Sequence, residues 1–359
     1  MVFDSYCLIL CTIVRMDKMK IDLNKIKEIT KGAVRITEEN NGVHFYRFTK
    51  EQEEMYKEFS DKHLADFYKK SFATAGVKLL FKTNSKTLNL KGHLFSGSSR
   101  FYYSIDIFIN GIFFDCIKNF DESVLPDNYS AEPFPVDRFS KSFEIGEGDK
   151  TVCIYLPWSM CTVLDELSLD DCSFIKPIKT NEKLLVFGDS ITQGYDSLYP
   201  SNRYACKLAE MIGAEEINKG IGGEMFRPDL AKIKEDFEPD YITVAYGTND
   251  WSSRNKDEFV SNCNNFFDAL YENYPKSKIF AISPVWRKDW ESNEKFCKFS
   301  EIEEYMKKVT ENLDNVTVIS GFEFVPHEEA CYGDLWLHPN DKGFEHYTQN
   351  LYEKIKKFL

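Results

Sequence analysis

The chain has 359 residues, which is long enough for about two domains. It carries 45 Lys and Arg residues against 58 Asp and Glu residues, so its formal net charge is −13. This negative charge repels phosphate backbones and anionic lipids, and argues against nucleic acids and membranes as partners. A hydrophobic content of 43% predicts packed globular structure rather than disorder.

The ten cysteines are spread through the chain without a C-x-x-C pair. This spacing predicts neither a zinc ribbon nor a dense disulfide framework, and it favours a reducing compartment. The apolar run within residues 1–20 lacks a basic start and a small-residue cleavage site. We therefore expect residues 1–20 to be a leader, with an upstream start codon as the alternative, and the protein to be cytoplasmic.

Residues 21–178 follow mainly a period of two, which is typical of strands. The clearest strand pair lies within residues 100–117, around Asn110 and Gly111, a dipeptide that suits a type I′ hairpin. Other strands are predicted within 77–95, 141–158 and 162–175, and a helix around 51–70. The pattern predicts an all-β sandwich domain of the jelly-roll type.

Polar residues 176–183 are the predicted linker to a second domain, over residues 179–359. There, apolar strands alternate with helices, and this alternation predicts an α/β domain of three layers with a parallel sheet covered on both faces. Strands are predicted at 184–188, 215–218, 241–246, 278–283 and 316–319. Helices are predicted at about 202–212, 228–236, 257–273, 299–312 and 340–357. In such a sheet, ligands bind beyond the carboxyl ends of the strands.

Four short blocks lie where these strands end or just before the last helix. They are "GDSITQGYD" (188–196), "NKGIGGE" (218–224), "GTND" (247–250) and "LHPNDKGF" (337–344). In this order they resemble blocks I, II, III and V of the SGNH (GDSL) hydrolases, a group of esterases with a flavodoxin-like fold. The β-sandwich before them further resembles two-domain bacterial carbohydrate esterases, among which enzymes that remove acetyl groups are prominent.

The resemblance implies catalytic roles for two residues of these blocks. Ser190 in the first block would be the nucleophile, and His338 in the last block would be its general base. A serine hydroxyl is a weak nucleophile and needs such a base within hydrogen-bonding reach. The family uses no cofactor, so none is expected here.

The resemblance also implies an oxyanion hole, because attack on a carbonyl creates a negative oxygen that needs preorganised donors. The donors would be the backbone N–H groups of Ser190 and Gly223 and the side-chain amide of Asn249. Gly223 is chosen because the family glycine falls five residues after the asparagine of block II; its neighbour Gly222 stays open. For Asn249, a helix-capping role is the alternative.

The third member of the expected triad departs from the family pattern. The family has an aspartate three residues before the histidine, where this chain has Leu335; the nearest acid is Asp334, four residues before. A loop one residue longer could still bring a carboxylate to Nδ1 of the imidazole, so Asp334 is our choice. The alternative is a Ser-His pair whose histidine is oriented by a backbone carbonyl or another acid.

A metal site is not expected. The near-helical spacing of His327, Cys331, Asp334 and His338 could suggest metal ligands. Glycine and proline residues interrupt this stretch, so a continuous helix that would bring the four together is not expected.

Aromatic residues give the best indication of the substrate. The candidate substrate-binding residues are Asp189, Trp251, Trp286, Trp290 and Trp336. The four tryptophans fall in loops at the expected ligand edge, where flat faces can stack on sugar rings; packing of the loops on the core is the alternative. For Arg287, a surface salt bridge is the default expectation.

The sequence thus predicts a serine esterase that removes small acyl groups, chiefly acetyl, from carbohydrate or related small esters. A carbohydrate-binding or scaffold protein with a degenerate hydrolase domain is the alternative from another class, and the shifted Asp334 is its one supporting feature. An acyltransferase or lipid-type acyl hydrolase on the same site also stays open, as does self-association into a homo-oligomer.

Overall fold

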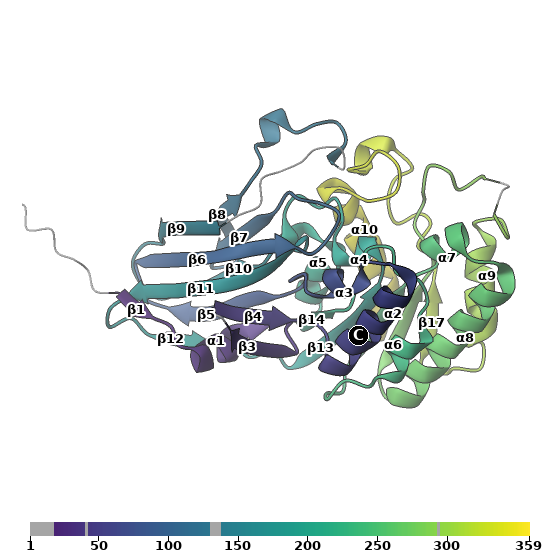
Figure 1. Ribbon diagram of the computed structural model, residues 1–359, viewed down its shortest axis with the longest axis horizontal. Helices are drawn as coiled ribbons and strands as arrows, with labels where there is room; N and C mark the ends of the chain where they lie inside the picture. The colour runs from purple at the N-terminus through teal and green to yellow at the C-terminus, as the bar shows by residue number, and fades with distance from the viewer. Residues whose placement is uncertain (1–17, 40–41, 130–137, 293–294) are drawn as a thin grey trace, which may run out of the picture.

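The computed structural model describes residues 18–39, 42–129, 138–292 and 295–359. Two antiparallel sheets form the first part of the structure and a parallel sheet with helices forms the second, side by side in Figure 1. The α/β domain predicted from the sequence is therefore present, preceded by antiparallel sheets. The jelly-roll connectivity stays a prediction.

The first antiparallel sheet has the strand order β3-β4-β11-β6-β9, with β1 paired to β11. Its strands are β1 (Lys18–Lys20), β3 (Arg35–Glu39), β4 (Gly42–Tyr46), β6 (Thr87–Ser96), β9 (Arg138–Glu144) and β11 (Met160–Asp170). The second has the order β12-β5-β10-β7-β8, with β2 paired to β5. Its strands are β2 (Thr30–Lys31), β5 (Lys78–Thr83), β7 (Ser104–Ile109), β8 (Ile112–Lys118), β10 (Lys150–Tyr155) and β12 (Ile175–Pro177).

Side chains at alternate positions of both sheets fill one core. In β5, Leu79 and Phe81 are fully buried, and in β10 so is Val152. The predicted hairpin is confirmed: Asn110 and Gly111 join β7 to β8 with φ values of 52° and 80°. Positive φ at both central residues is what a type I′ turn requires.

Several boundaries differ from those expected. Residues 1–17 of the expected leader lie outside the described residues, and residues 18–20 are strand β1, paired with the end of β11. The expected linker is shorter, because β12 takes its first residues and β13 (Glu182–Gly188) begins before its end. α1 (Leu23–Ile29) was not predicted.

The helix expected at 51–70 is two helices, α2 (Lys50–His63) and α3 (Phe67–Ser71). A capping box begins α2, and Leu64 in the left-handed conformation ends it. These helices leave the sandwich: Tyr56 packs in the core of the α/β part, and α2 lies beside α6 (Pro228–Lys232) in Figure 1. The N-terminal half therefore covers part of the α/β domain.

The parallel sheet has the strand order β14-β13-β15-β16-β17. With β13, its strands are β14 (Ala214–Asn218), β15 (Tyr241–Ala245), β16 (Lys278–Ile282) and β17 (Val316–Ile319). Numbered along the domain, this order is 2-1-3-4-5, that of flavodoxin-like folds. In β13, Leu185 and Phe187 face one core while Leu184 and Val186 face the other, because both sides of the sheet are covered.

Helices cover the two faces of this sheet. On one face lie α6, α8 (Lys256–Asn273) and α9 (Glu301–Thr310), and on the other α5 (Tyr204–Met211) and α10 (Asp341–Ile355). Helix α6 ends earlier than predicted, at Lys232, because the chain turns so that buried Glu235 can pair with Lys219. The short helices α4 (Ser190–Gln193) and α7 (Thr248–Ser253) were not predicted.

Two observations bear on the expected location. Within the described ranges, no helix has the length and apolar character needed to cross a bilayer. The eight cysteines in those ranges are all free thiols, and four of them are buried: Cys153, Cys206, Cys263 and Cys331. The cytoplasmic location itself stays a prediction.

A buried ion pair between Arg203 and Glu216 links the start of α5 to β14, next to the loop of block II. Arg203 Nη1 and Nη2 lie 2.8 and 3.0 Å from the two carboxylate oxygens of Glu216. Glu216 also accepts a hydrogen bond from the side chain of Asn218, at the start of block II. We therefore expect this pair to stabilise the beginning of that loop.

Replacing Arg203 with Met leaves the Glu216 charge buried without its partner, so we expect the free energy of unfolding to fall by about 3–5 kcal/mol. Urea denaturation followed by circular dichroism measures the change. Lys232→Met is the matched control, because Lys232 pairs with Asp229 at the surface and should change stability little. An equal effect of both substitutions would contradict a special role for the buried pair.

Candidate active site

Ser190 lies where the fold places ligands. β13 ends at Gly188, Asp189 is the N-cap of α4, and Ser190 is the first residue of that helix. A Cβ at Gly188 would lie 2.0 Å from Thr192 Oγ1, so only glycine allows this sharp turn from strand to helix. The order of the sheet reverses between β13 and β15, and the crevice beyond such strand ends is where flavodoxin-like folds bind ligands.

Three side chains form a continuous hydrogen-bonded series. Ser190 Oγ lies 2.8 Å from His338 Nε2, and His338 Nδ1 lies 2.6 Å from Asp334 Oδ2. The imidazole keeps 14% of its exposure, whereas Ser190 is 4% exposed. The structure thus brings together the serine, the histidine and the acid that the sequence proposed as a triad.

The extra residue between Asp334 and His338 is absorbed by the backbone. Leu335 adopts a left-handed conformation with φ 59°, and Gly333 N–H donates to His338 O at 2.9 Å to close the loop. This compact loop, rather than a longer reach of the side chain, brings the carboxylate to the imidazole.

The Asp334 carboxylate is held rigidly. Its Oδ1 accepts hydrogen bonds from the backbone N–H groups of Trp336, Leu337 and His338, at 3.0, 2.8 and 3.0 Å. Burial alone would raise the pKa of Asp334, but the hydrogen bond and charge of His338, together with the backbone donors, hold it well below its usual range. Asp334 is therefore a carboxylate at neutral pH.

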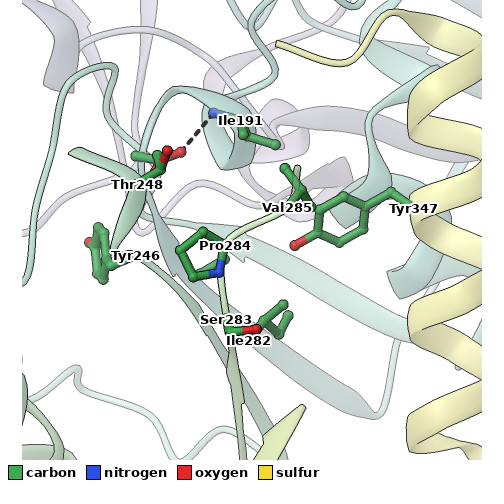
Figure 2. Close-up of a pocket in the computed structure, with 10 residues that line it drawn as sticks. Ile191, Tyr246, Thr248, Ile282, Ser283, Pro284, Val285 and Tyr347 are labelled. Carbon is green, nitrogen blue, oxygen red and sulfur yellow. Dashed lines mark hydrogen bonds between the residues drawn. The ribbon is translucent and has the colours of Figure 1, made fainter. Parts of the chain in front are cut away.

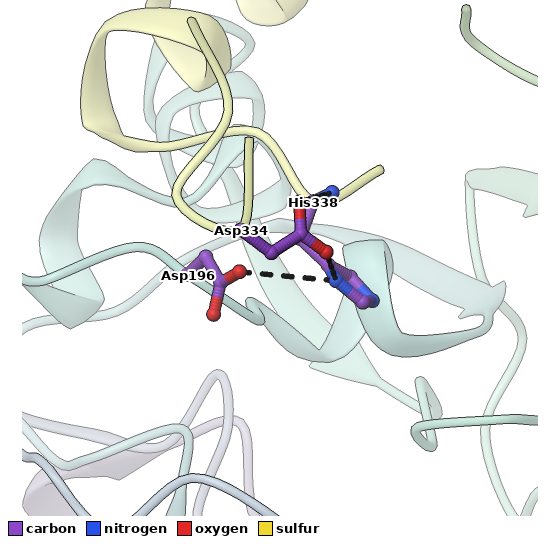
Figure 3. Close-up of side chains that lie close together, drawn as sticks. All are labelled: Asp196, Asp334 and His338. Atoms are coloured by element: carbon purple, nitrogen blue, oxygen red, sulfur yellow. Dashed lines mark hydrogen bonds and ion pairs between the residues drawn. The ribbon is translucent and has the colours of Figure 1, made fainter. Parts of the chain in front are cut away.

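A second acid, missed in the sequence, lies beside the imidazole (Figure 3). Asp196 is fully buried, and its Oδ2 lies 3.8 Å from His338 Nδ1. Arg100 donates to both its oxygens, at 2.6 and 3.2 Å, and the Tyr102 hydroxyl donates to Oδ1 at 3.0 Å. Protein donors thus already satisfy this carboxylate. Asp196 is the last residue of block I, but its partners are distant in the sequence and belong to the antiparallel part. No local pattern therefore pointed to it.

The antiparallel part also holds the histidine loop. The ring of Tyr195 packs against His338, with 5.3 Å between their centroids, and its hydroxyl accepts a hydrogen bond from Ser99 N–H at 3.2 Å. The N–H of Tyr129 donates to the carbonyl of Gly333 at 3.2 Å. The loops that carry Ser99 and Tyr129 therefore restrain the base from outside the α/β domain.

The two glycines of block II differ in their surroundings. Gly222 N–H donates to Gln193 Oε1 at 2.8 Å, so that donor is already engaged. A Cβ at Gly222 would lie 2.4 Å from the Tyr195 hydroxyl, which excludes any side chain. Gly223 has φ 88°, and the nearest atom to a Cβ there would belong to Phe67, 3.6 Å away. Of the two, Gly223 is the one without an assigned N–H partner inside the loop.

Asn249 lies beside the same loop. Its Nδ2 donates to the carbonyl of Glu224 at 2.9 Å, and Glu224 directly follows Gly223. The capping alternative is not what the structure shows, because the N-cap of α7 is Gly247 and Asn249 lies within the helix. An amide nitrogen carries two hydrogens, so this bond orients the group and leaves the other hydrogen for a ligand.

Asp189 has a structural role rather than the substrate contact expected of it. Its side chain is 2% exposed and accepts a hydrogen bond from Ile191 N–H at 2.9 Å, as an N-cap does. Burial raises its pKa to about 7. It lines a cavity of about 20 Å³ under the strand ends, shown in Figure 2. That volume suits one water molecule, far below the roughly 300 Å³ of a ligand pocket.

The four candidate tryptophans separate into buried and exposed ones. Trp251 is fully buried and donates its indole N–H to Cys297 O, and Trp286 is 8% exposed and stacks on His327. Trp290 packs partly buried between the two helical layers. Trp336 alone among the four keeps a large exposed area, 42%. The expected stacking role is therefore wrong for Trp251, which packs α7 onto the core, in line with the packing alternative.

Arg287 corrects another expectation. It is 4% exposed rather than at the surface, and its guanidinium lies between the rings of Trp251 and Trp336, at 5.1 and 5.3 Å from their centroids. It also pairs with Asp289 and donates to Thr248 at the start of α7. Arg287 thus joins the loop after β16 to the Asn249 helix and supports the exposed ring of Trp336.

The chain resembles known proteins in sequence and in fold. Residues 186–346 match the GDSL-like Lipase/Acylhydrolase family. A comparison with curated protein sequences gave no match. The resemblance that the four sequence blocks indicated is confirmed, because the match lies within the α/β part of the chain, which is GDSL-like in sequence.

Solved structures resemble both parts of the chain. The salicylyl-acyltransferase SsfX3 from a tetracycline biosynthetic pathway has a TM-score of 0.73 at 18% identity, over 92% of this chain and 94% of that one. A putative GDSL-like lipase from Bacteroides ovatus has a TM-score of 0.71 at 19% identity, over 95% and 97%. A family two carbohydrate esterase from Cellvibrio japonicus has a TM-score of 0.63 at 15% identity, over 95% and 97%. At these identities the likeness establishes the fold.

The geometry predicts that Ser190 reacts with an electrophile directed at activated serines. We expect a fluorophosphonate to add one group per chain, detected by intact mass, because His338 can accept the proton of the hydroxyl. Ser190→Ala should abolish labelling, and His338→Gln should slow it at least about tenfold. Unchanged labelling of Ser190→Ala would show that the reactive group lies elsewhere.

Proposed function

We propose that the protein is a serine esterase that removes small acyl groups, chiefly acetyl, from carbohydrate or related small esters. The observation that carries the proposal is the unbroken series from Ser190 Oγ through His338 to the Asp334 carboxylate. The GDSL-type domain supports acyl chemistry at this place. The substrate is a small-molecule or oligosaccharide ester, and the reaction needs no cofactor.

The first half of the reaction forms an acyl-enzyme. Ser190 Oγ attacks the ester carbonyl carbon while its proton passes to His338 Nε2. Asp334 stabilises the imidazolium that results and holds Nδ1–H in the required tautomer. The tetrahedral intermediate then breaks its bond to the alcohol oxygen, and the imidazolium gives its proton to that oxygen.

The second half returns the enzyme. A water molecule loses a proton to His338 and attacks the acyl carbon. The bond to Ser190 Oγ breaks, the serine regains a proton, and the carboxylic acid leaves. Ser190 N–H, Gly223 N–H and the free amide hydrogen of Asn249 are the proposed donors to the oxyanion in both halves. The engaged N–H of Gly222 and the fixed amide of Asn249 support this choice.

A carbohydrate ester is favoured by two features. Trp336, two residues before His338, offers an exposed ring on which a sugar can stack. The Cellvibrio japonicus protein, of similar fold over nearly the whole chain, is a carbohydrate esterase. The scaffold alternative is disfavoured, because the shifted Asp334 reaches the imidazole after all.

An acyltransferase is the second candidate, and one observation favours it. The salicylyl-acyltransferase SsfX3 shares the fold over 92% of this chain. In an acyl transfer by this protein, an alcohol or amine of an acceptor molecule would replace water in the second half of the reaction. Adding candidate sugar acceptors to the assay and searching for acylated products by mass spectrometry distinguishes transfer from hydrolysis.

The principal test compares the wild type with Ser190→Ala on p-nitrophenyl esters of increasing chain length, then on acetylated oligosaccharides. We expect turnover of the acetate, little beyond the butyrate, and a loss of at least about 10³-fold in kcat for the variant, because the nucleophile is gone. Ser261→Ala, at an exposed serine of α8, is the control. Equal turnover by Ser190→Ala would refute the nucleophile.

Asp334→Asn tests the shifted acid. The amide cannot stabilise the imidazolium as a carboxylate does, so we expect kcat to fall by about 10²–10⁴ with a smaller change in KM. The rate is measured with p-nitrophenyl acetate, and a circular dichroism spectrum checks the fold. If the rate stays at the wild-type level, another group orients His338, and Asp196→Asn then shows whether the second acid does so.

A further inference from the structure

A lysine from the N-terminal half contacts the glycine loop of the site. Lys70 lies on α3, and its Nζ donates to the carbonyl oxygen of Gly222 at 2.9 Å. The same Nζ pairs with Asp66 at 2.8 Å, and the Lys70 side chain is only 12% exposed. The ammonium is thus held over the loop by an ion pair on its own helix.

The contacted carbonyl belongs to the peptide unit whose N–H is that of Gly223. A peptide bond is planar, and in the trans form its C=O and N–H point in opposite directions. The described residues contain no cis peptide bond. A donor that fixes the direction of the Gly222 oxygen therefore also fixes the direction of the Gly223 N–H, away from Lys70.

Such an external restraint matters because both residues are glycines. Without Cβ atoms, Gly222 and Gly223 have access to more backbone conformations than other residues, so the peptide between them can rotate at little cost. On the other side, the Gly222 N–H is held by Gln193 Oε1. Gln193 is itself fixed, because its Nε2 donates to the carbonyls of Gly97 and Trp158. That preceding peptide is held at both ends, since Glu224 N–H also donates to the Ile221 carbonyl at 3.0 Å, whereas the Gly222–Gly223 peptide is held at its carbonyl by Lys70.

We propose that Lys70 is a positioning residue of the oxyanion hole, which orients and polarises the Gly222–Gly223 peptide so that the Gly223 N–H points at the reacting carbonyl oxygen. The inference rests on the proposed function, in which Gly223 is a donor. A charged donor on the carbonyl strengthens the N–H of the same peptide, because hydrogen bonds in a series polarise one another. Through Lys70 the N-terminal half would contribute to catalysis without touching the substrate.

Lys70→Met tests this, because methionine keeps most of the side chain and removes the charge and the donor. We expect kcat for p-nitrophenyl acetate to fall about 10- to 100-fold, less than the loss of a whole oxyanion donor, while KM changes less than about threefold. Lys70→Arg, which retains a charged donor, should recover at least about a third of the lost activity. Lys69→Met, an exposed neighbour on the same helix, is the matched control and should keep wild-type kcat.

The variants separate positioning from folding and from the proposed function itself. A purely structural role would lower the melting temperature and the amount of active enzyme without a selective loss of kcat, so active sites are counted by fluorophosphonate labelling. If Lys70→Met does not fold, Lys70→Ala, which also lacks a donor, replaces it with the same expected loss of kcat. Wild-type kcat per active site in the Lys70 variant, with Ser190→Ala inactive, would overturn the positioning role and leave the esterase standing. A fully active Ser190→Ala would overturn both.

Discussion

The site depends on one hydrogen bond between distant parts of the chain, from Ser190 to His338, 148 residues apart. Neither residue can act alone, because the hydroxyl needs a base and the base needs a fixed direction. The fold brings the two residues together, because β13 lies inside the parallel sheet and the loop before α10 returns to the carboxyl ends of its strands.

The antiparallel part of the structure also holds residues of the site in place. Arg100 satisfies the buried Asp196 beside the imidazole, and Tyr129 fixes the loop that carries His338. A buried carboxylate without a partner would be costly, so the two parts are bound to one another at the place where the chemistry is proposed. Separating them would leave charged groups unpaired around the base. Residues of both parts of the chain, and not those of the α/β part alone, therefore hold the site together.

Much of the fold could be predicted because its signals are local. Continuous apolar strands, the Asn110–Gly111 turn and the four blocks each depend on a few adjacent residues, and the structure has them at the expected places within a few residues. The contributions of Asp196 and Lys70 could not be found in this way, since their partners lie about 100 or more residues away. The burial of Trp251 was missed for a related reason. A predicted loop position does not tell whether the ring points into the core or into solvent.

The conformation of Leu335 has a consequence for how such proteins are recognised. One residue in the left-handed conformation shortens the path along the backbone. The Asp334 carboxylate therefore reaches Nδ1 of His338 although one more residue separates the two than in the family pattern. The contact therefore depends on a distance in space rather than on a fixed interval in the sequence. A search that demands an invariant gap between acid and histidine would miss this arrangement.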